Sequence, residues 1–252
     1  MQLRVLGNAG GSAPGRQLSS YLIDEVVLVD AGSVTSTLEL DDQLKIETVL
    51  LTHGHLDHVG QLPFLLIHRY ERDVPPIEII ASAYTHQTVE DHFMNGRVWV
   101  TYDVATNGKP ERMPRTVMEP RETRRILDRY DIRTIPLLHE VPCQGYLISD
   151  GESKVIVCGD TTTTDEVWRV ANETEGLGGI LIECAWTDDE LARITGHMSP
   201  GLLLADLKKL TVDVPVYVTH RKPGYEDDIE AMLRASGESR LRYVRDGDVI
   251  AF

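Results

Sequence analysis

Short hydrophobic runs that stop abruptly at polar residues recur along the chain. Four of these runs cover residues 49–51 (VLL), 155–157 (VIV), 180–182 (ILI) and 214–218 (VPVYV). Their length and their content of β-branched residues predict buried strands, and the polar residues after each run predict loops at the strand ends. An earlier group of strands is predicted at residues 3–6, 21–23 and 26–29, with glycine and proline turns before the second of them.

Helical periodicity fills the stretches between the later runs. The predicted helices cover residues 58–70, 84–93, 165–172, 200–210 and 226–235. Strands followed by mixed strands and helices predict an α/β fold in which two sheets pack together with helices outside. Residues 95–120 contain glycines and prolines without clear periodicity, and we interpret them as a lid or an oligomer arm. We expect residues 1–252 to form one domain that includes this segment.

The composition is that of an ordinary globular protein, with 42% hydrophobic and 26% charged residues. No apolar run approaches the roughly 18 to 20 residues that cross a bilayer. The first residues also lack the basic-then-apolar pattern of a signal peptide. We therefore expect a cytoplasmic protein without a membrane partner. The three cysteines are scattered, and we interpret them as reduced thiols without a catalytic role.

The net charge of −15 bears on the choice of partner. A strongly acidic chain repels a polyanion, so we do not expect extended nucleic-acid binding. Arg121, Arg124, Arg125 and Arg129 form a local basic group, and their spacing favours an exposed helix face over an RNA-binding groove. A small anionic substrate stays compatible with the charge, because bound metal ions can dominate the local field.

The sequence THGHLDH directly follows the hydrophobic run at 49–51. It contains His53, His55, Asp57 and His58. An extended backbone directs His53 and His55 to the same side, and the start of a helix brings Asp57 and His58 toward a neighbouring point. This arrangement predicts two adjacent metal sites. Imidazole and carboxylate ligands suit zinc, iron or manganese, so the ligand types do not select one metal.

Three further candidate ligands occur at the ends of later hydrophobic runs. They are His139, Asp160 and His220. Each of them alone is more typical of a capping or hydrogen-bonded polar residue than of a metal ligand. Together with the four residues of THGHLDH they supply the seven side chains of a binuclear site.

This series of residues resembles the metallo-β-lactamase superfamily, whose HxHxDH signature matches the histidines and aspartate of THGHLDH. The later His, Gly-Asp and Thr-His positions also match, so the resemblance covers nearly the whole chain. It implies an αββα sandwich, with two mixed β-sheets flanked by helices and the metals at one edge. The family pattern assigns one metal to His53, His55 and His139 and the other to Asp57, His58 and His220, with Asp160 bridging them.

Two phosphodiester-cleaving branches of the superfamily fit the sequence best. The stretch HEVPCQGY at 139–146 is similar to the HxxPxxGY pattern of tRNase Z and of class II cyclic nucleotide phosphodiesterases. The stretch GQLPFLL at 60–66 is closer to the tRNase Z form. Five other stretches resemble the cyclic nucleotide branch: ECAW at 183–186, GHMSP at 196–200, LKKL at 207–210, THRKP at 219–223 and TVEDHFMN at 88–95.

The resemblance implies a metal-dependent phosphodiesterase that hydrolyses 3′,5′-cyclic nucleotides, cyclic AMP or cyclic GMP, to nucleoside 5′-monophosphates. Two divalent metal ions per chain are expected, zinc first and iron or manganese as alternatives. Asp57 would bind metal and orient the attacking hydroxide. His197 would protonate the departing ribose 3′ oxygen, and Glu183 would orient His197.

Substrate binding has two candidates in the same pattern. His92 and Asn95 lie in the helix that resembles the cyclic nucleotide branch, and an imidazole and an amide suit a phosphate or a purine. A capped helix end packed on Trp99 is the alternative interpretation of these residues.

The sequence leaves other functions open. One is a tRNase Z-like RNA 3′-processing endonuclease or another cyclic phosphodiesterase, and the acidic charge counts against the RNA substrate. Another is a non-enzymatic di-iron sensor that binds oxygen, in which Glu183 and His197 would have no evident purpose. The expected partner is a small cyclic nucleotide, and the sequence leaves open whether the chain forms a homodimer.

Overall fold

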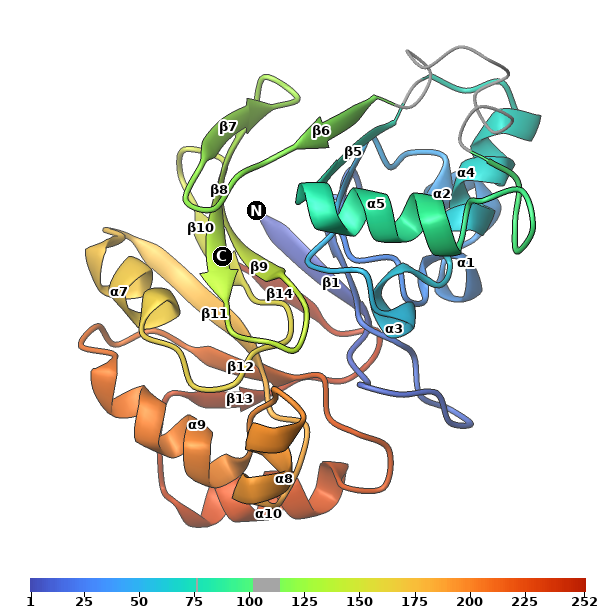
Figure 1. Cartoon of the computed structure of the whole chain (residues 1–252). Coiled ribbons are helices and arrows are strands. Elements are labelled where there is room, and N and C mark those ends of the chain that lie inside the picture. The colour runs from blue at the N-terminus through green and yellow to red at the C-terminus, as the bar shows by residue number, and fades with distance from the viewer. Residues whose placement is uncertain (76, 102–113) are drawn as a thin grey trace.

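Two mixed β-sheets lie face to face in the computed structural model, with helices on the outer face of each (Figure 1). The structure describes residues 1–75, 77–101 and 114–252. The strand order of the first sheet is β14 (Val249–Ala251), β1 (Gln2–Gly7), β2 (Ser20–Ile23), β3 (Val27–Val29), β4 (Thr48–Leu50), β5 (Glu78–Ala81) and β6 (Arg115–Val117). The order of the second sheet is β13 (Leu241–Tyr243), β12 (Val216–Thr219), β11 (Leu177–Glu183), β10 (Lys154–Val157), β9 (Cys143–Ser149), β8 (Tyr130–Leu137) and β7 (Thr123–Ile126).

The two sheets share one pattern of strand pairing. In the first sheet the pairs from β14 to β3 are antiparallel and those from β3 to β6 are parallel. In the second sheet the pairs from β7 to β10 are antiparallel and those from β10 to β13 are parallel. Each parallel half needs helical crossovers, which accounts for the helices on the outer faces.

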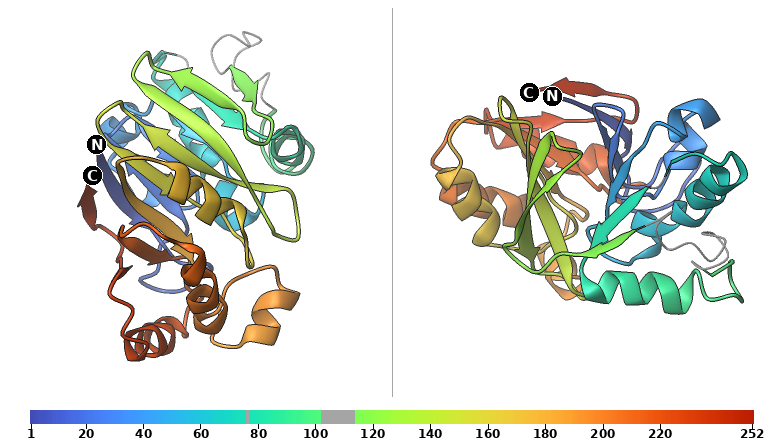
Figure 2. Two further views of the ribbon diagram at one scale, coloured as in Figure 1. Left: turned by 90° about the vertical axis from the view of Figure 1, so that its left-hand side faces the viewer. Right: turned by 90° about the horizontal axis from the view of Figure 1, so that it is seen from above.

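The helices divide between the two sheets according to their position in the chain (Figures 1 and 2). Those beside the first sheet are α1 (Val34–Thr37), α2 (Leu40–Gln43), α3 (Leu56–Val59), α4 (Leu62–Glu71) and α5 (Ala83–His92). Those beside the second are α7 (Glu166–Glu173), α8 (Asp189–Ile194), α9 (Pro200–Asp206) with the 3₁₀ turn η2 (Leu207–Lys209), and α10 (Glu226–Ala235).

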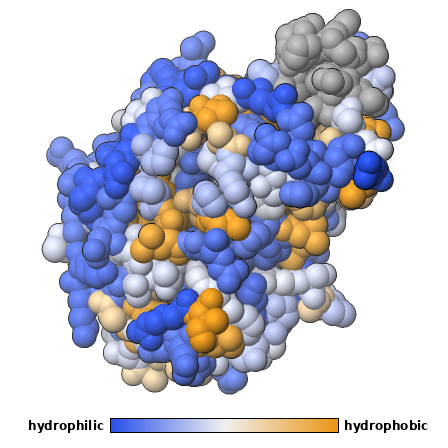
Figure 3. Space-filling view, viewed as in Figure 1, coloured by the Kyte–Doolittle hydropathy of each residue, from blue (hydrophilic) through white to orange (hydrophobic). Residues whose placement is uncertain are grey.

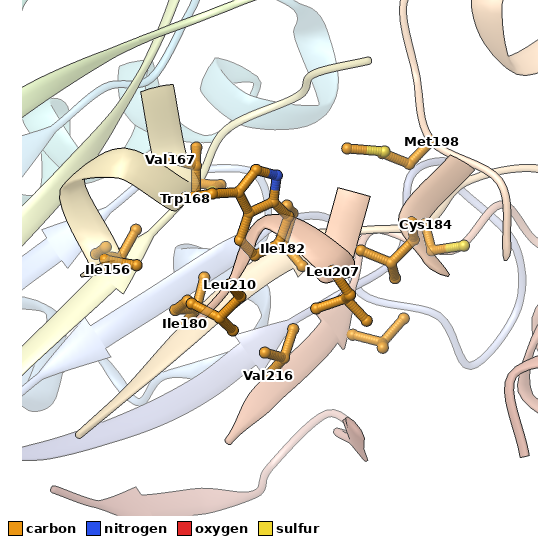
Figure 4. Packing of buried hydrophobic residues seen from close by; sticks show 14 of the residues in the cluster. Ile156, Val167, Trp168, Ile180, Ile182, Cys184, Met198, Leu207, Leu210 and Val216 are labelled. Carbon is orange, nitrogen blue, oxygen red and sulfur yellow. The ribbon is translucent and has the colours of Figure 1, made fainter. Parts of the chain in front are cut away.

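Three buried clusters correspond to the three interfaces between these layers. Between the sheets, Val5 and Val29 of the first share a cluster with Ile148 and Leu181 of the second. The helices on the first sheet close a second cluster. On the second sheet, Trp168 of α7 lies close to Ile180 and Ile182 of β11 (Figure 4). This layering confirms the predicted αββα sandwich.

The surface is mostly polar on the face shown in Figure 3, where hydrophobic side chains form small separate groups. One such group lies over α8, where Leu191 is 38% and Ile194 is 67% exposed. Among the described residues, no helix combines the length and the apolar character required to span a bilayer. The predicted homodimer stays a prediction.

The hydrophobic runs of the sequence locate the strands well, and two predictions of helices are wrong. The predicted helix 58–70 is divided into α3 and α4, because Pro63 lacks the amide that would continue a helix and fits the first turn of a new one. The arginines of residues 121–129 do not lie on a helix face. Arg124 and Arg125 lie on β7, Arg121 precedes this strand, and Arg129 follows it in the turn to β8, which places Leu127 and Asp128 at positive φ.

The predicted lid or arm at 95–120 falls partly outside the described residues, which omit 102–113. On its C-terminal side, β6 pairs in parallel with β5 as the last strand of the first sheet. On its N-terminal side, Trp99 packs on Phe64 of α4 with ring centroids 4.9 Å apart. Both described flanks of the segment are therefore tied to the first sheet and its helices.

Candidate metal centre

The segments that follow β4, β8, β10 and β12 meet at one edge of the sandwich and bring the seven predicted ligands together. One group, with ligand atoms within 4.8 Å of one another, contains His53, His55, His139 and Asp160. A second contains Asp57, His58 and His220. We call these seven residues the histidine–aspartate cluster.

Asp160 lies between the two groups. Its Oδ2 is 3.8 Å from Nε2 of His53, 3.9 Å from Nε2 of His139 and 3.2 Å from Nε2 of His220. Its Oδ1 is 3.3 Å from Nε2 of His58. A carboxylate whose oxygens lie near imidazoles of both groups has the position that a bridging ligand requires.

Three buried imidazole nitrogens of the cluster are left without a hydrogen-bond partner. They are Nε2 of His53, of His58 and of His220. Leaving a buried polar atom unpaired costs about 1–3 kcal/mol, so native structures rarely leave several in one place. Coordination to a metal ion would satisfy all three, and the donor set of imidazoles and carboxylates suits a divalent transition metal.

Local structure explains why THGHLDH places its side chains on one side. His53 lies three residues after the end of β4, and His55, the residue before α3, has an extended conformation (φ −70°, ψ 151°). Asp57 and His58 then lie in the first turns of α3. Gly54 is required between the two histidines, because a Cβ there would lie 2.8 Å from a methyl group of Thr88 on α5.

The opposite ring nitrogens of four histidines contact hydrogen-bonding groups outside the seven. Nδ1 of His53 lies 3.0 Å from Oγ1 of Thr52. Nδ1 of His58 donates to Asp30 at 2.7 Å, and Nδ1 of His139 donates to the carbonyl of Gly196 at 2.9 Å. Nδ1 of His220 lies 2.8 Å from Oγ of Ser19. Such contacts fix the ring and the tautomer that leaves Nε2 for a metal.

The sequence reasoning missed Asp30 and Ser19, which contact the candidate ligands His58 and His220. Asp30 also accepts hydrogen bonds from the amide and hydroxyl of Thr52, which links it to the start of THGHLDH. A signal was present, because Asp30 directly follows a buried hydrophobic run just as His220 does. Both residues have left-handed backbone, with φ of 58° and 52°. Ser19 had no comparable signal.

Gly10 brings the first loop of the chain against His220. A Cβ at Gly10 would lie 2.6 Å from Nε2 and from Cδ2 of the His220 ring. The amide of Gly10 also donates to the carbonyl of Arg221 at 3.1 Å. Only glycine fits here without displacing a candidate metal ligand.

The electrostatics of the cluster favour one buried anion among imidazoles. Burial opposes ionisation of Asp160, yet His220 and His58 bring its pKa well below the ordinary range. Burial, with the neighbouring His58, lowers the pKa of His220 to about 3. Burial also opposes a charge on His58, but Asp160 and Asp30 raise the pKa of that ring well above its usual value. Of His58 and His220, His58 is therefore the imidazole that must release a proton when a metal binds.

Glu183 and His197 form a buried pair beside the cluster. Nδ1 of His197 donates to Oε1 of Glu183 at 2.8 Å, and the other carboxylate oxygen accepts from the amide of Met198 at 3.2 Å. Burial works against a charge on His197, but the Glu183 carboxylate raises its pKa. His197 is also 3.9 Å from Asp160 and groups with Asp160 and His220 as a further candidate ligand.

The two predicted substrate-binding residues are not brought into this cluster. His92 is the exposed last residue of α5, and none of the metal-ligating groups of the described residues includes it. The Asn95 amide donates to the carbonyl of Asp91 and accepts from the amides of Arg97 and Val98, each at 2.9 Å. The structure therefore gives Asn95 the capping role that the sequence left as the alternative.

A family model described as a β-lactamase superfamily domain matches residues 25–220, which include the entire histidine–aspartate cluster. The chain belongs to the metallo-β-lactamase superfamily. This family match and the cluster together support a metal-dependent hydrolase.

Curated relatives within the superfamily match only part of the chain. Ribonuclease Z of Treponema pallidum is 28% identical over 155 residues, which are 58% of this chain and 47% of the relative. The matched part therefore spans about half the length of that protein.

Solved structures of the superfamily share the fold over almost the full length. The metallo-β-lactamase fold protein YhfI from Bacillus subtilis has a TM-score of 0.80 and 19% identity, covering 99% of this chain and 98% of that one. Unliganded yeast PDE1 has a TM-score of 0.81 and 19% identity, with 98% of each chain covered. Both likenesses confirm the predicted fold.

Proposed function

We propose that this protein is a binuclear metal-dependent phosphodiesterase that hydrolyses 3′,5′-cyclic nucleotides to nucleoside 5′-monophosphates. The observation that carries the proposal is the hydrogen-bonded Glu183–His197 pair next to the histidine–aspartate cluster, in which Asp160 lies near imidazoles of both ligand groups. The stretches that resemble cyclic nucleotide phosphodiesterases support the choice of substrate, as does the likeness in fold to the phosphodiesterase PDE1 of yeast.

The proposal includes two divalent ions per chain, zinc first and iron or manganese as alternatives. His53, His55 and His139 would hold one ion, Asp57, His58 and His220 the other, and Asp160 both. When bound, such ions polarise phosphoryl oxygens and lower the pKa of water, which supplies a nucleophile at neutral pH.

His197 supplies the proton for the departing oxygen in this proposal. In a 3′,5′-cyclic nucleotide that group is the ribose 3′ oxygen, a poor leaving group that benefits from protonation. The carboxylate of Glu183 accepts the Nδ1 proton of His197, so Nε2 is the nitrogen available to the substrate. The amides of Met198 and Thr161 donate to Glu183 and hold the carboxylate in place.

Asp57 orients the attacking water. It lies in the first turn of α3, and its Oδ2 is 3.8 Å from Nε2 of His220. The nearby imidazoles of His58 and His220 lower its pKa against the effect of burial. The carboxylate is therefore ionised and can accept a hydrogen bond from the water.

An RNA 3′-processing endonuclease is the second candidate, and the match to ribonuclease Z favours it. The local basic group of the sequence, Arg121, Arg124, Arg125 and Arg129, lies in and around β7. Each has a carboxylate partner: Arg121 pairs with Glu166, Arg124 with Glu78, Arg125 with Asp131 and Arg129 with Asp24. These pairs reduce the positive field that an RNA backbone would need, and the net charge is −15.

A panel of substrates tests the proposal. Zinc-loaded protein is incubated with cyclic AMP, cyclic GMP, a 2′,3′-cyclic nucleotide and a precursor tRNA, beside elemental analysis of the protein. We expect turnover of a 3′,5′-cyclic nucleotide to the 5′-monophosphate. Cleavage of the precursor tRNA alone would establish the second candidate instead. A protein that holds two iron ions and turns over none of the four substrates would favour the oxygen-binding sensor.

A further inference from the structure

Lys222 is a charged residue beside the histidine–aspartate cluster that the proposed mechanism does not use. Its ammonium Nζ donates a hydrogen bond to the carbonyl oxygen of Gly10 at 2.5 Å. Gly10 in turn lies against the His220 ring, on the side that carries Nε2. The ammonium is therefore separated from the unpaired Nε2 of His220 by a single residue.

The backbone fixes this position from two sides. The amide of Lys222 donates to the carbonyl of Ala185 at 3.3 Å, and Ala185 lies two residues after Glu183 in the chain. The amide of Ala185 donates to the carbonyl of Met198, next to His197. Lys222 is consequently held beside the loops that carry Glu183 and His197.

One aromatic ring lies beside the ammonium, and a second ring packs on the first. Nζ of Lys222 lies 5.9 Å from the centroid of the Trp186 ring, within the range of a cation–π contact. Tyr225 meets the same indole edge to face, with centroids 5.3 Å apart, and is itself 38% exposed. A cation against aromatic rings keeps less of its hydration shell, and its attraction for an anion is stronger there than in open solvent.

The ammonium has no anionic partner within the described residues. Its hydrogen bond goes to a neutral carbonyl, and none of the ion pairs in the ranges 1–75, 77–101 and 114–252 involves it. Other lysines behave differently: Lys45 pairs with Asp42, and Lys209 with Asp165 and Asp206. In a chain with a net charge of −15, Lys222 is a positive charge available to a ligand at the metal edge.

We propose that Lys222, backed by Trp186, forms an oxyanion subsite that binds a non-bridging phosphate oxygen of the substrate and of the product. The identity of the substrate in this inference rests on the proposed function. The binding of a phosphate group rests only on the geometry. The ammonium exchanges the Gly10 carbonyl for a charged oxygen, which is a stronger acceptor.

Binding measurements on metal-loaded protein test the subsite without any turnover. The titrants are inorganic phosphate and adenosine 5′-monophosphate, measured by calorimetry on the wild type, Lys222→Met, Lys222→Gln and Lys222→Arg. Lys208→Met is the matched control, because Lys208 is an exposed lysine on η2. Elemental analysis of each protein reports whether the metal centre stays loaded.

We expect Lys222→Met and Lys222→Gln to bind both titrants about 10- to 100-fold more weakly, as for the loss of one hydrogen bond to a charged group. Lys222→Arg should stay within a few fold of the wild type, and Lys208→Met should be unchanged. Equal affinity in the wild type and the two neutral variants would overturn the proposal. Weaker binding that only follows a loss of metal would overturn it too.

These outcomes separate the subsite from the proposed function. If no cyclic nucleotide is hydrolysed and Lys222→Met still loses phosphate affinity, the subsite stands and the substrate assignment fails. If cyclic nucleotides are hydrolysed and Lys222→Met binds phosphate normally, the substrate assignment stands and the subsite fails. In an active enzyme Lys222→Met should raise KM for the cyclic nucleotide, whereas a purely structural residue would alter thermal stability without changing KM.

Discussion

Asp30 and His58 are joined by a hydrogen bond of 2.7 Å between a carboxylate oxygen and Nδ1, although Asp30 directly follows β3 and His58 lies on α3. Both side chains are buried, with exposed fractions of 1% for Asp30 and 2% for His58. The contact orients the imidazole so that Nε2 lies 3.3 Å from Asp160. Asp30 is therefore a supporting residue of the metal centre that no ligand signature contains.

Replacing Asp30 tests this supporting role. Asp30→Asn should weaken metal binding about 10- to 100-fold, the range found when an outer hydrogen-bond partner of a ligand is lost. Zinc affinity and metal content per chain are the measurements. Asp41→Asn is the control, because Asp41 is an exposed carboxylate on α2. Unchanged zinc affinity in Asp30→Asn would show that the hydrogen bond does not contribute.

Gly10→Ala tests the close approach of the first loop to His220. The added methyl group would lie 2.6 Å from the ring, so the ring or the loop must move. We expect about 1–3 kcal/mol of destabilisation in urea unfolding of the metal-free protein and a lower metal content. Gly11→Ala is the comparison, because its Cβ would meet only Pro223, at 3.2 Å. Equal stability and metal content in both variants would contradict the packing described.

Glu183→Gln tests how the carboxylate acts on His197. An acid must be protonated to donate, so activity falls as the pH rises through the pKa of His197. The carboxylate raises this pKa, and a neutral amide removes that effect. The alkaline limb of the kcat profile should therefore move to lower pH, by about 1–3 units for the loss of an adjacent opposite charge.

Glu190→Gln is the control for this measurement, because Glu190 is exposed on α8. Its profile should coincide with that of the wild type. A limb that stays in place in Glu183→Gln would show that the limb reports a group other than His197.

The ligand residues were accessible to sequence reasoning for a physical reason. His53, His55, Asp57 and His58 are neighbours in the chain, and Asp160 and His220 follow buried hydrophobic runs whose ends meet at one sheet edge. Ser19 contacts a residue 201 positions away, and no local pattern reports such a pairing. The roles of all these residues in metal binding and catalysis stay predictions.

The arginine hairpin shows where local spacing misleads. Arg121, Arg125 and Arg129 recur at every fourth position, which suits one face of a helix. In the structure Leu127 and Asp128 form the turn of a β-hairpin with φ of 50° and 49°. Such a turn is usually marked by Asn-Gly or Asp-Gly, and Leu-Asp gives no such signal. Pairing with β8 across the sheet, not the local sequence, determines the strand.

The most direct test of the account measures hydrolysis of 3′,5′-cyclic AMP and cyclic GMP by metal-loaded wild type and His197→Ala, with metal content determined on the same samples. The account predicts turnover to the 5′-monophosphate by the wild type. In the variant it predicts a kcat about 10²- to 10⁴-fold lower, the usual contribution of a general acid, with the metal content unchanged. An unchanged kcat in His197→Ala, a variant that loses its metal, or a fully loaded wild type that hydrolyses neither nucleotide would contradict it.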